Sequence, residues 1–134
     1  MVTAIHLLLD PRTGRMEHSS AGHPPVLRLT AARQPEWLQG ALAPPLGTGW
    51  GNRPSVEHTL EPGERLLLFT DGLIERREST LDDGLAALAE AAASAPEGDL
   101  GAWCDHLLGC LSGAAGGFED DVALLAVERA DAQE

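Results

Sequence analysis

The sequence contains no lysine and no tyrosine, and all nine of its basic residues are arginines, against 21 acidic residues. The formal net charge is therefore −12, and the chain has no surplus of basic residues to contact the phosphates of nucleic acid. This argues against nucleic acid as a partner. Most of the negative charge is expected to be solvated surface, although it is also compatible with carboxylates gathered around metal ions.

Long apolar runs are also lacking. None approaches the ~20 residues of a membrane-spanning helix, and the N-terminus has neither the basic segment nor the apolar segment of a signal peptide. We therefore expect a cytoplasmic protein with no membrane partner. At 134 residues, the chain has the length of one domain with one core.

Cysteine and aromatic residues are scarce. Cys104 and Cys110 lie six apart in a helical pattern and so face different sides, and His106 points away from Cys104. A zinc site from these three would need a distorted helix and a fourth ligand, so we expect buried free thiols. The tryptophans are too scattered for a stacking surface: Trp37, Trp50 and Trp103.

The first half of the chain alternates short apolar segments with turns rich in proline and glycine, which is typical of β-strands. Strands are predicted at residues 3–9, 16–20, 26–30, 36–39, 55–60 and 65–70. The first two should form a hairpin, the next two should complete a meander, and the last two should pair across the Pro62-Gly63 turn. Residues 40–53 lack periodicity and are predicted to be a loop.

The second half has the pattern of two amphipathic helices followed by one strand. The first helix, residues 81–93, is capped by Ser79, Thr80 or Asp82. Its predicted apolar face consists of Leu81, Leu85, Leu88 and Ala92.

Asp99 should cap the second helix. Its apolar stripe consists of Leu100, Trp103, Leu107, Leu108 and Leu111. A glycine-rich exit at 112–117, a strand at 122–127 and a disordered tail at 129–134 complete the chain. Hairpins followed by grouped helices predict an α+β layered fold.

The stretch EPGERLLLFTDGLIE (61–75) places a carboxylate at the end of a buried strand. Gly72 lets the backbone turn away beneath Asp71, although Asp71 is also explained as a polar turn residue. Asp120 and Asp121 stand just before the last strand. If these strands are antiparallel neighbours, the acids share one rim, where they repel one another unless cations lie among them. The spacing suggests a site for Mg²⁺ or Mn²⁺.

Four blocks carry a family resemblance: DPRTGRMEHSSAGHPPVLRL (10–29), APPLG (43–47), EPGERLLLFTDGLIE (61–75) and EDDVALLAV (119–127). Together they resemble the type 2C, metal-dependent Ser/Thr protein phosphatases, in the bacterial SpoIIE-type branch that regulates sigma factors. The resemblance implies a layered sandwich of two antiparallel sheets flanked by helices. It also implies that residues 1–128 form one partial phosphatase domain.

By the same resemblance, Asp71 and Asp120 are metal ligands, with Asp121 as the second choice for the latter. Thr70 and Gly72 shape the rim without donating side chains. Two ions of Mn²⁺ or Mg²⁺ are implied in the complete domain. A metal-bound water is then the nucleophile that attacks the phosphorus of a phosphoserine.

Three further residues have two readings each. His23 either contacts substrate near the site or stabilises its own loop, and the second interpretation is favoured. Arg76 and Arg77 either meet phosphate oxygens or balance the neighbouring acids as exposed residues. The second reading is again favoured.

One part of the family pattern is missing. The family carries an N-terminal Gly-Gly-Asp motif whose aspartate bridges both metals, whereas Asp10 here belongs to a turn. We therefore interpret the chain as the C-terminal part of the domain, with a bare apolar face that promotes self-association. The leading hypothesis is a phosphatase acting on a phosphorylated anti-sigma-factor antagonist protein. The alternative is a truncated, inactive module with a binding or regulatory role.

Overall fold

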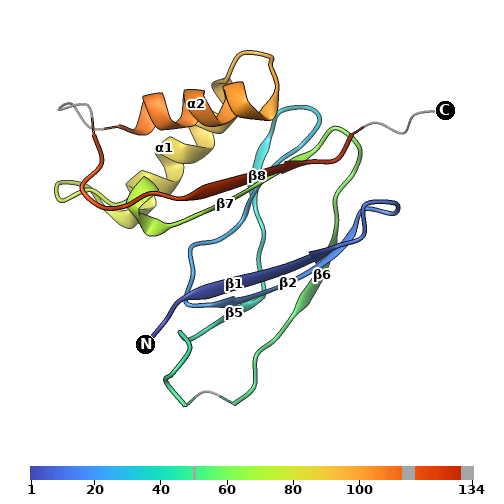
Figure 1. The fold of residues 1–134 in the computed structure, drawn as a ribbon, viewed down its shortest axis with the longest axis vertical. Helices are drawn as coiled ribbons and strands as arrows, with labels where there is room; N and C mark the ends of the chain where they lie inside the picture. Colours follow the sequence, from blue (N-terminus) through green and yellow to red (C-terminus); the bar gives the residue numbers. More distant parts are fainter. Residues whose placement is uncertain (50, 113–116, 131–134) are drawn as a thin grey trace.

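The chain folds into two stacked β-sheets, with two helices packed on the outer face of one of them (Figure 1). The computed structural model describes residues 1–49, 51–112 and 117–130. Trp50, most of the predicted glycine-rich exit and residues 131–134 of the predicted tail lie outside this described part. Within it, the predicted α+β class with layered sheets is confirmed.

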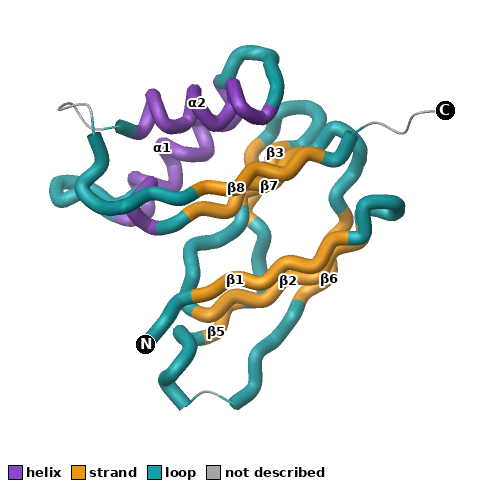
Figure 2. The backbone as a smooth tube through the Cα atoms, viewed as in Figure 1, coloured by secondary structure: helices purple, strands orange, loops and turns teal. Residues whose placement is uncertain are grey.

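The first sheet is built around β2 (Arg15–Ala21), which pairs with every other strand of that sheet (Figure 2). Its antiparallel neighbours are β1 (Ala4–Leu9) and β6 (Val56–Thr59). A two-residue strand, β5 (Leu42–Ala43), pairs with it in parallel. The strand β5 lies inside the predicted loop 40–53, because so short a segment shows no periodicity of its own.

The second sheet has the order β4-β3-β7-β8, and all of its pairs are antiparallel. Its strands are β4 (Pro35–Trp37), β3 (Leu27–Leu29), β7 (Arg65–Phe69) and β8 (Leu124–Glu128). The predicted first hairpin is confirmed, and so is the antiparallel pairing of the next two strands. The continuous meander is wrong, since β2 and β3 belong to different sheets.

The predicted pairing of 55–60 with 65–70 is also wrong. The turn between them carries the chain from the first sheet to the second, so β6 pairs with β2 while β7 pairs with β3 and β8. Gly63, at φ 83°, donates its N–H to the carbonyl of Arg129 at 2.7 Å. A short turn therefore does not by itself make a hairpin here, because the two strands bury their side chains in different layers.

The strand β7 is buried on both faces. Leu66 packs between the sheets with Met16 and Leu60, whereas Leu67 packs beneath the helices. Burying a leucine completely stabilises a fold by about 1.5–3 kcal/mol, so this strand contributes to both cores. The prediction that 65–69 is a buried strand is confirmed.

The helices cover the second sheet. The first, α1 (Leu81–Ser94), is capped at its start by Thr80, whose side chain forms a capping box with Asp83. Leu88 and Ala92 are fully buried, but Leu81 is 54% exposed, contrary to the prediction. The first turn of α1 reaches the mouth of a cavity, so Leu81 has little to pack against.

The second helix, α2 (Leu100–Leu111), is capped by Asp99 as predicted. Its buried residues are Trp103, Leu107 and Leu111. The Trp103 indole donates to the Ala92 carbonyl at 3.2 Å and so joins α2 to α1. Neither helix of the described ranges is long and apolar enough to cross a membrane.

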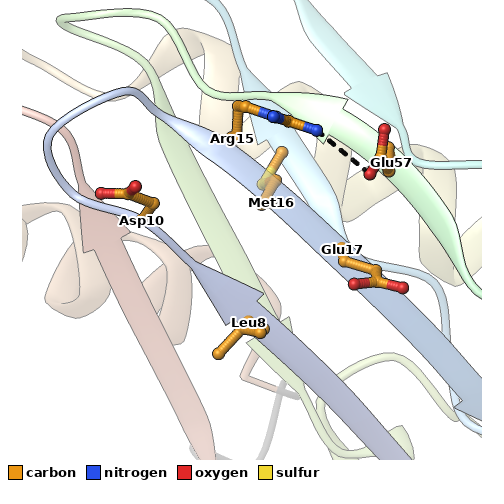
Figure 3. Close-up of a pocket in the computed structure, with 6 residues that line it drawn as sticks. All are labelled: Leu8, Asp10, Arg15, Met16, Glu17 and Glu57. Atoms are coloured by element: carbon orange, nitrogen blue, oxygen red, sulfur yellow. Dashed lines mark hydrogen bonds and ion pairs between the residues drawn. The ribbon is translucent and has the colours of Figure 1, made fainter.

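The first sheet carries no helix among the described residues, since both helices contact the second sheet. A depression of about 240 Å³ lies beside the β1–β2 hairpin (Figure 3). Leu8, at its edge, is 63% exposed. The Arg15–Glu57 ion pair, 3.3 Å long, crosses this surface, where such pairs contribute little. Self-association through this face stays a prediction.

Arg129, expected in the tail, is held in the fold. Its guanidinium donates to the carbonyls of Leu60, at 2.8 Å, and Arg12, at 3.0 Å. Its backbone is also bonded to Gly63 and Glu64. The ordered part of the chain therefore continues past residue 128.

Two histidines meet in the first sheet with their rings 4.9 Å apart. His18 is only 4% exposed. Its pKa is lowered from the ordinary value of 6.5, mainly because the ring is buried and to a lesser extent because His58 lies beside it. Burial and then Arg28 lower the pKa of His58. Arg28 lies in β3 and is ion-paired with Glu36 at 2.8 Å. Both histidines are therefore neutral near pH 7.

This pair should make the fold sensitive to mild acid. Because the folded-state pKa values lie below 6.5, the unfolded chain binds more protons, and stability falls as the pH drops below 6.5. The slope is at most about 1.4 kcal/mol per pH unit for each proton. Urea unfolding of the chain between pH 5 and 7.5 should show the loss.

His18→Phe should flatten that slope, since the substituted side chain takes up no proton. His6→Gln is the matched control because His6 is exposed on β1. An equal slope in the wild-type chain and in His18→Phe would contradict a role for the buried pair.

Candidate functional site

The ends of β7 and β8 form one rim. The last pair of opposite residues in these two strands is Phe69 of β7 and Leu124 of β8. Beyond it, the Thr70 N–H donates to the Ala123 carbonyl at 3.0 Å, and the Ala123 N–H donates to Thr70 Oγ1 at 2.9 Å. Antiparallel pairing thus places Asp71 and Asp120 at the same edge of the sheet, although they lie 49 positions apart in the sequence.

Gly72 is pressed against the backbone of the acidic segment. A Cβ at this position would lie 2.2 Å from the Asp121 carbonyl oxygen and 3.4 Å from the Asp120 carbonyl carbon. The backbone of Gly72 is not in the left-handed region, so the need for glycine is this close approach. The chain turns at Gly72 as predicted, but glycine is needed there because two chain segments touch, not because the backbone must be flexible.

The segment after Thr70 forms the 3₁₀ turn η1 (Asp71–Leu73). The Asp71 carbonyl accepts the N–H groups of Ile74, at 3.0 Å, and Glu75, at 2.9 Å. Leu73 and Ile74 are buried beneath the helices, whereas the side chain of Asp71 is exposed. The core therefore anchors the turn while the carboxylate remains accessible.

His23 braces the same rim from the AGHPP loop. Its Nε2 lies 2.9 Å from the Phe69 carbonyl, immediately before Thr70, and a nitrogen that donates to a carbonyl must carry the proton. The backbone N–H of His23 donates to Ser20 Oγ at 3.3 Å. These contacts correspond to the loop-fixing reading. Sequence reasoning missed the contact with Phe69, because 46 residues separate the two partners.

The AGHPP and APPLG blocks also lie against each other. The Gly22 N–H donates to the Ala43 carbonyl at 2.7 Å, and Gly22 has a φ of 66° that favours glycine. A Cβ on Gly22 would lie 2.5 Å from a ring carbon of Pro45. Three blocks that are remote in sequence are thus brought together behind Asp71.

Three aspartates lie at or next to the rim, and their side chains face solvent. Asp71, Asp120 and Asp121 are all exposed, and Asp120 Oδ1 accepts the Asp121 N–H at 2.7 Å. No group of three or more His, Cys, Asp or Glu is arranged to hold a metal in the part of the chain that the structure describes. Exposed carboxylate oxygens suit a hard cation such as Mn²⁺ or Mg²⁺. The ligand roles of these aspartates stay a prediction.

A cavity of about 630 Å³ opens beside the rim. Residues of both sheets and of α1 line it, among them Asp71, His23, His18, Leu42 and Leu81. The Nδ1 atoms of His18 and His23 are buried and have no hydrogen-bond partner among the described residues. Most of the residues that line the cavity are apolar, and these histidine nitrogens are among its few polar atoms.

Two other predictions have an outcome here. Arg76 lies over the Phe118 ring at 5.1 Å, and Arg77 is exposed. These observations agree with the favoured interpretation of both as surface residues.

The prediction of buried thiols is wrong. Cys104 is only partly buried and Cys110 is exposed, because α2 buries only the stripe that starts at Trp103.

A family model described as "Stage II sporulation protein E (SpoIIE)" matches residues 1–130. A solved structure of the RsbU and RsbW domains of a Mycobacterium tuberculosis protein is 35% identical, with a TM-score of 0.85. That match covers 98% of this chain and 38% of the other. The chain belongs to the SpoIIE family. The two relationships agree with the four sequence blocks that now lie around one rim.

More distant structures share the fold of this SpoIIE-family chain. The manganese-presoaked phosphatase domain of SpoIIE from Bacillus subtilis is 19% identical, with a TM-score of 0.76, and the match covers 98% of this chain and 58% of the other. The PP2C domain of SiaA from Pseudomonas aeruginosa is 18% identical, with a TM-score of 0.75 and coverages of 94% and 51%. The chain thus spans less than two thirds of each structure. Its fold is that of PP2C-type phosphatase domains.

The contact at Gly72 yields a stability prediction. Gly72→Ala should destabilise the fold by about 1–3 kcal/mol, because the methyl group must displace the Asp121 backbone. Gly109→Ala in α2 is the matched control. Among the described residues, a Cβ at Gly109 meets no atom within 4 Å beyond its own helix, so this variant should be neutral or stabilising by up to about 1 kcal/mol. Chemical denaturation of both variants tests the difference, and equal stabilities would contradict the close contact.

Proposed function

We propose that this chain forms the C-terminal part of a metal-dependent phosphoprotein phosphatase domain. Asp71 and Asp120 would each supply a carboxylate oxygen to one of two Mn²⁺ or Mg²⁺ ions, and Asp121 is the second choice beside Asp120. The observation that carries the proposal is the junction of Thr70 with Ala123. It holds the TDG segment and the EDD segment at one rim.

The rigidity of that rim supports a catalytic use. Binding sites on strands and short turns hold their groups more accurately than sites on loops. Here Leu73 and Ile74 anchor the turn in the core, and His23 is bonded to the carbonyl before Thr70. The residues present can therefore hold carboxylates in fixed places facing solvent. When bound, a pair of divalent ions acidifies water and stabilises the charge of a phosphoryl group in transfer.

The proposed substrate is a phosphoserine on an anti-sigma-factor antagonist protein. The support is the 35% identity with a protein whose solved part contains RsbU and RsbW domains. By that relationship, the partners belong to bacterial sigma-factor regulation. The cytoplasm is the compartment that we infer for this function. Residues 1–128 are the proposed extent of the phosphatase part.

A second candidate is an inactive module with a binding or regulatory role. One observation favours it: within the described ranges, no three metal-ligating side chains converge. The sequence also lacks the Gly-Gly-Asp motif that the resemblance associates with the bridging carboxylate. The two candidates differ in a measurable property, which is metal-dependent turnover.

The deciding experiment compares two chains. The 134-residue chain should show negligible Mn²⁺-dependent hydrolysis of p-nitrophenyl phosphate and of a phosphoserine protein, because too few ligands are present to fix two ions. A longer chain that carries an upstream segment with a Gly-Gly-Asp motif should be active. Asp71→Asn in the longer chain should reduce hydrolysis to the level of the metal-free sample.

Asp105→Asn is the control, because Asp105 is an exposed aspartate on α2, and it should retain activity. An inactive longer chain that is folded and binds Mn²⁺ would favour the regulatory module. Turnover by the short chain that is lost in Asp71→Asn would place a complete site within these residues and refute the proposed dependence on an upstream carboxylate.

A further inference from the structure

The exposed side of α2 carries a histidine and a cysteine, two residue types whose side chains can ligate zinc. His106 and Cys110 are four residues apart, so they share a helix face one turn from each other. Cys110 Sγ lies 3.4 Å from His106 Nε2. Cys110 is exposed and His106 is half-buried. Sequence reasoning tested Cys104, His106 and Cys110 as a trio and so overlooked the two that lie together.

The separation of the two atoms matches the bite of a tetrahedral zinc ion. Zinc lies about 2.3 Å from a thiolate sulfur and about 2.0 Å from an imidazole nitrogen, so at a tetrahedral angle the two donors are about 3.5 Å apart. A hydrogen bond between thiol and imidazole explains the 3.4 Å separation equally well in the metal-free chain. That bond already holds the two donor atoms at the required separation, and chelation needs only that the imidazole nitrogen and the sulfur turn from each other toward the ion.

Cys110 lies on an exposed part of α2. Among the described residues, and apart from its own chain neighbours and the helix backbone, nothing lies within 4 Å of a Cβ added at the adjacent Gly109. The Arg65 guanidinium lies over the Trp103 ring at 5.3 Å. The pKa of the other cysteine, Cys104, is raised, mainly by burial and then by Asp105. The Arg65 cation opposes this rise at Cys104. The net charge of −12 also favours a cation.

We propose that His106 and Cys110 form a two-ligand site for Zn²⁺ on α2, with water completing the tetrahedron. Binding replaces the thiol proton, which leaves to solvent, while neutral imidazole donates its lone pair. Thiolate and imidazole favour zinc over the hard cations Mn²⁺ and Mg²⁺. The site is therefore separate in place and in ion preference from the carboxylates at the rim.

The bound ion would join two successive turns of α2. Leu107 and Leu111, which lie in the same turns, are buried against the sheet. Because only the folded helix presents both ligands together, Zn²⁺ should stabilise the native chain in proportion to its free concentration.

The test is calorimetric titration of the reduced 134-residue chain with ZnCl₂ in excess Mg²⁺. We expect one Zn²⁺ per chain, with affinity that weakens as the pH falls. His106→Ala and Cys110→Ser should each weaken binding by at least about tenfold, the equivalent of 1.4 kcal/mol. Co²⁺ in place of Zn²⁺ should give a sulfur-to-metal charge-transfer absorption that Cys110→Ser abolishes.

Cys104→Ser and His6→Ala are the matched controls, because both keep the pair on α2 intact, and both should bind Zn²⁺ like the wild-type chain. The helical circular dichroism of every variant should equal that of the wild type, since the altered ligands are not in the core. Unchanged binding in Cys110→Ser, loss of binding in either control, or one Zn²⁺ shared by two chains would each overturn the proposed site.

Discussion

The burial of β7 on both faces is the constraint on which the rest of the structure depends. Leu66 belongs to the core between the sheets, and Leu67 belongs to the core beneath the helices. A strand fixed from both sides cannot slip by one residue without exchanging its two faces. Its end is therefore set accurately, and the turn that follows places Asp71 at a defined position. Because β3 and β8 occupy both edges of β7, β6 pairs with β2 instead.

The rim shows how remote segments are joined by backbone groups rather than by the acids themselves. Thr70 is bonded to Ala123 in both directions, and Gly72 admits the Asp121 carbonyl because it has no side chain. His23 is bonded to the carbonyl at the end of β7. The carboxylates are left free of these structural bonds, apart from the local one at Asp120. Such an arrangement separates the groups that hold the rim from those available to a cation.

Donor chemistry divides the possible ion sites of this SpoIIE-family chain into distinct kinds. Carboxylate oxygens at the rim suit hard cations, whereas the Cys110 thiol with His106 suits zinc. A third group of donors, the His18–His58 pair, lies within the electrostatic influence of the Arg28 cation at His58, and both histidines have lowered pKa values, mainly because of burial. Burial instead makes that pair a source of acid sensitivity. The position of a histidine in the fold thus decides whether its imidazole is available to an ion, as at His106, or makes the fold sensitive to acid, as at His18 and His58.

The sequence by itself determined the local elements and their faces, because these depend on neighbouring residues. The apolar run 65–69 indicated the buried strand, Asp99 was correctly assigned as a cap, and Thr80 was among three candidates. The shared rim was a conditional prediction, and the β7–β8 pairing in the structure met its condition. Partner choice was decided only by the tertiary structure: β6 crosses to β2, Leu81 is left exposed, and Gly72 meets the Asp121 carbonyl. These outcomes depend on which buried faces fit together across long separations, and no local periodicity records that fit.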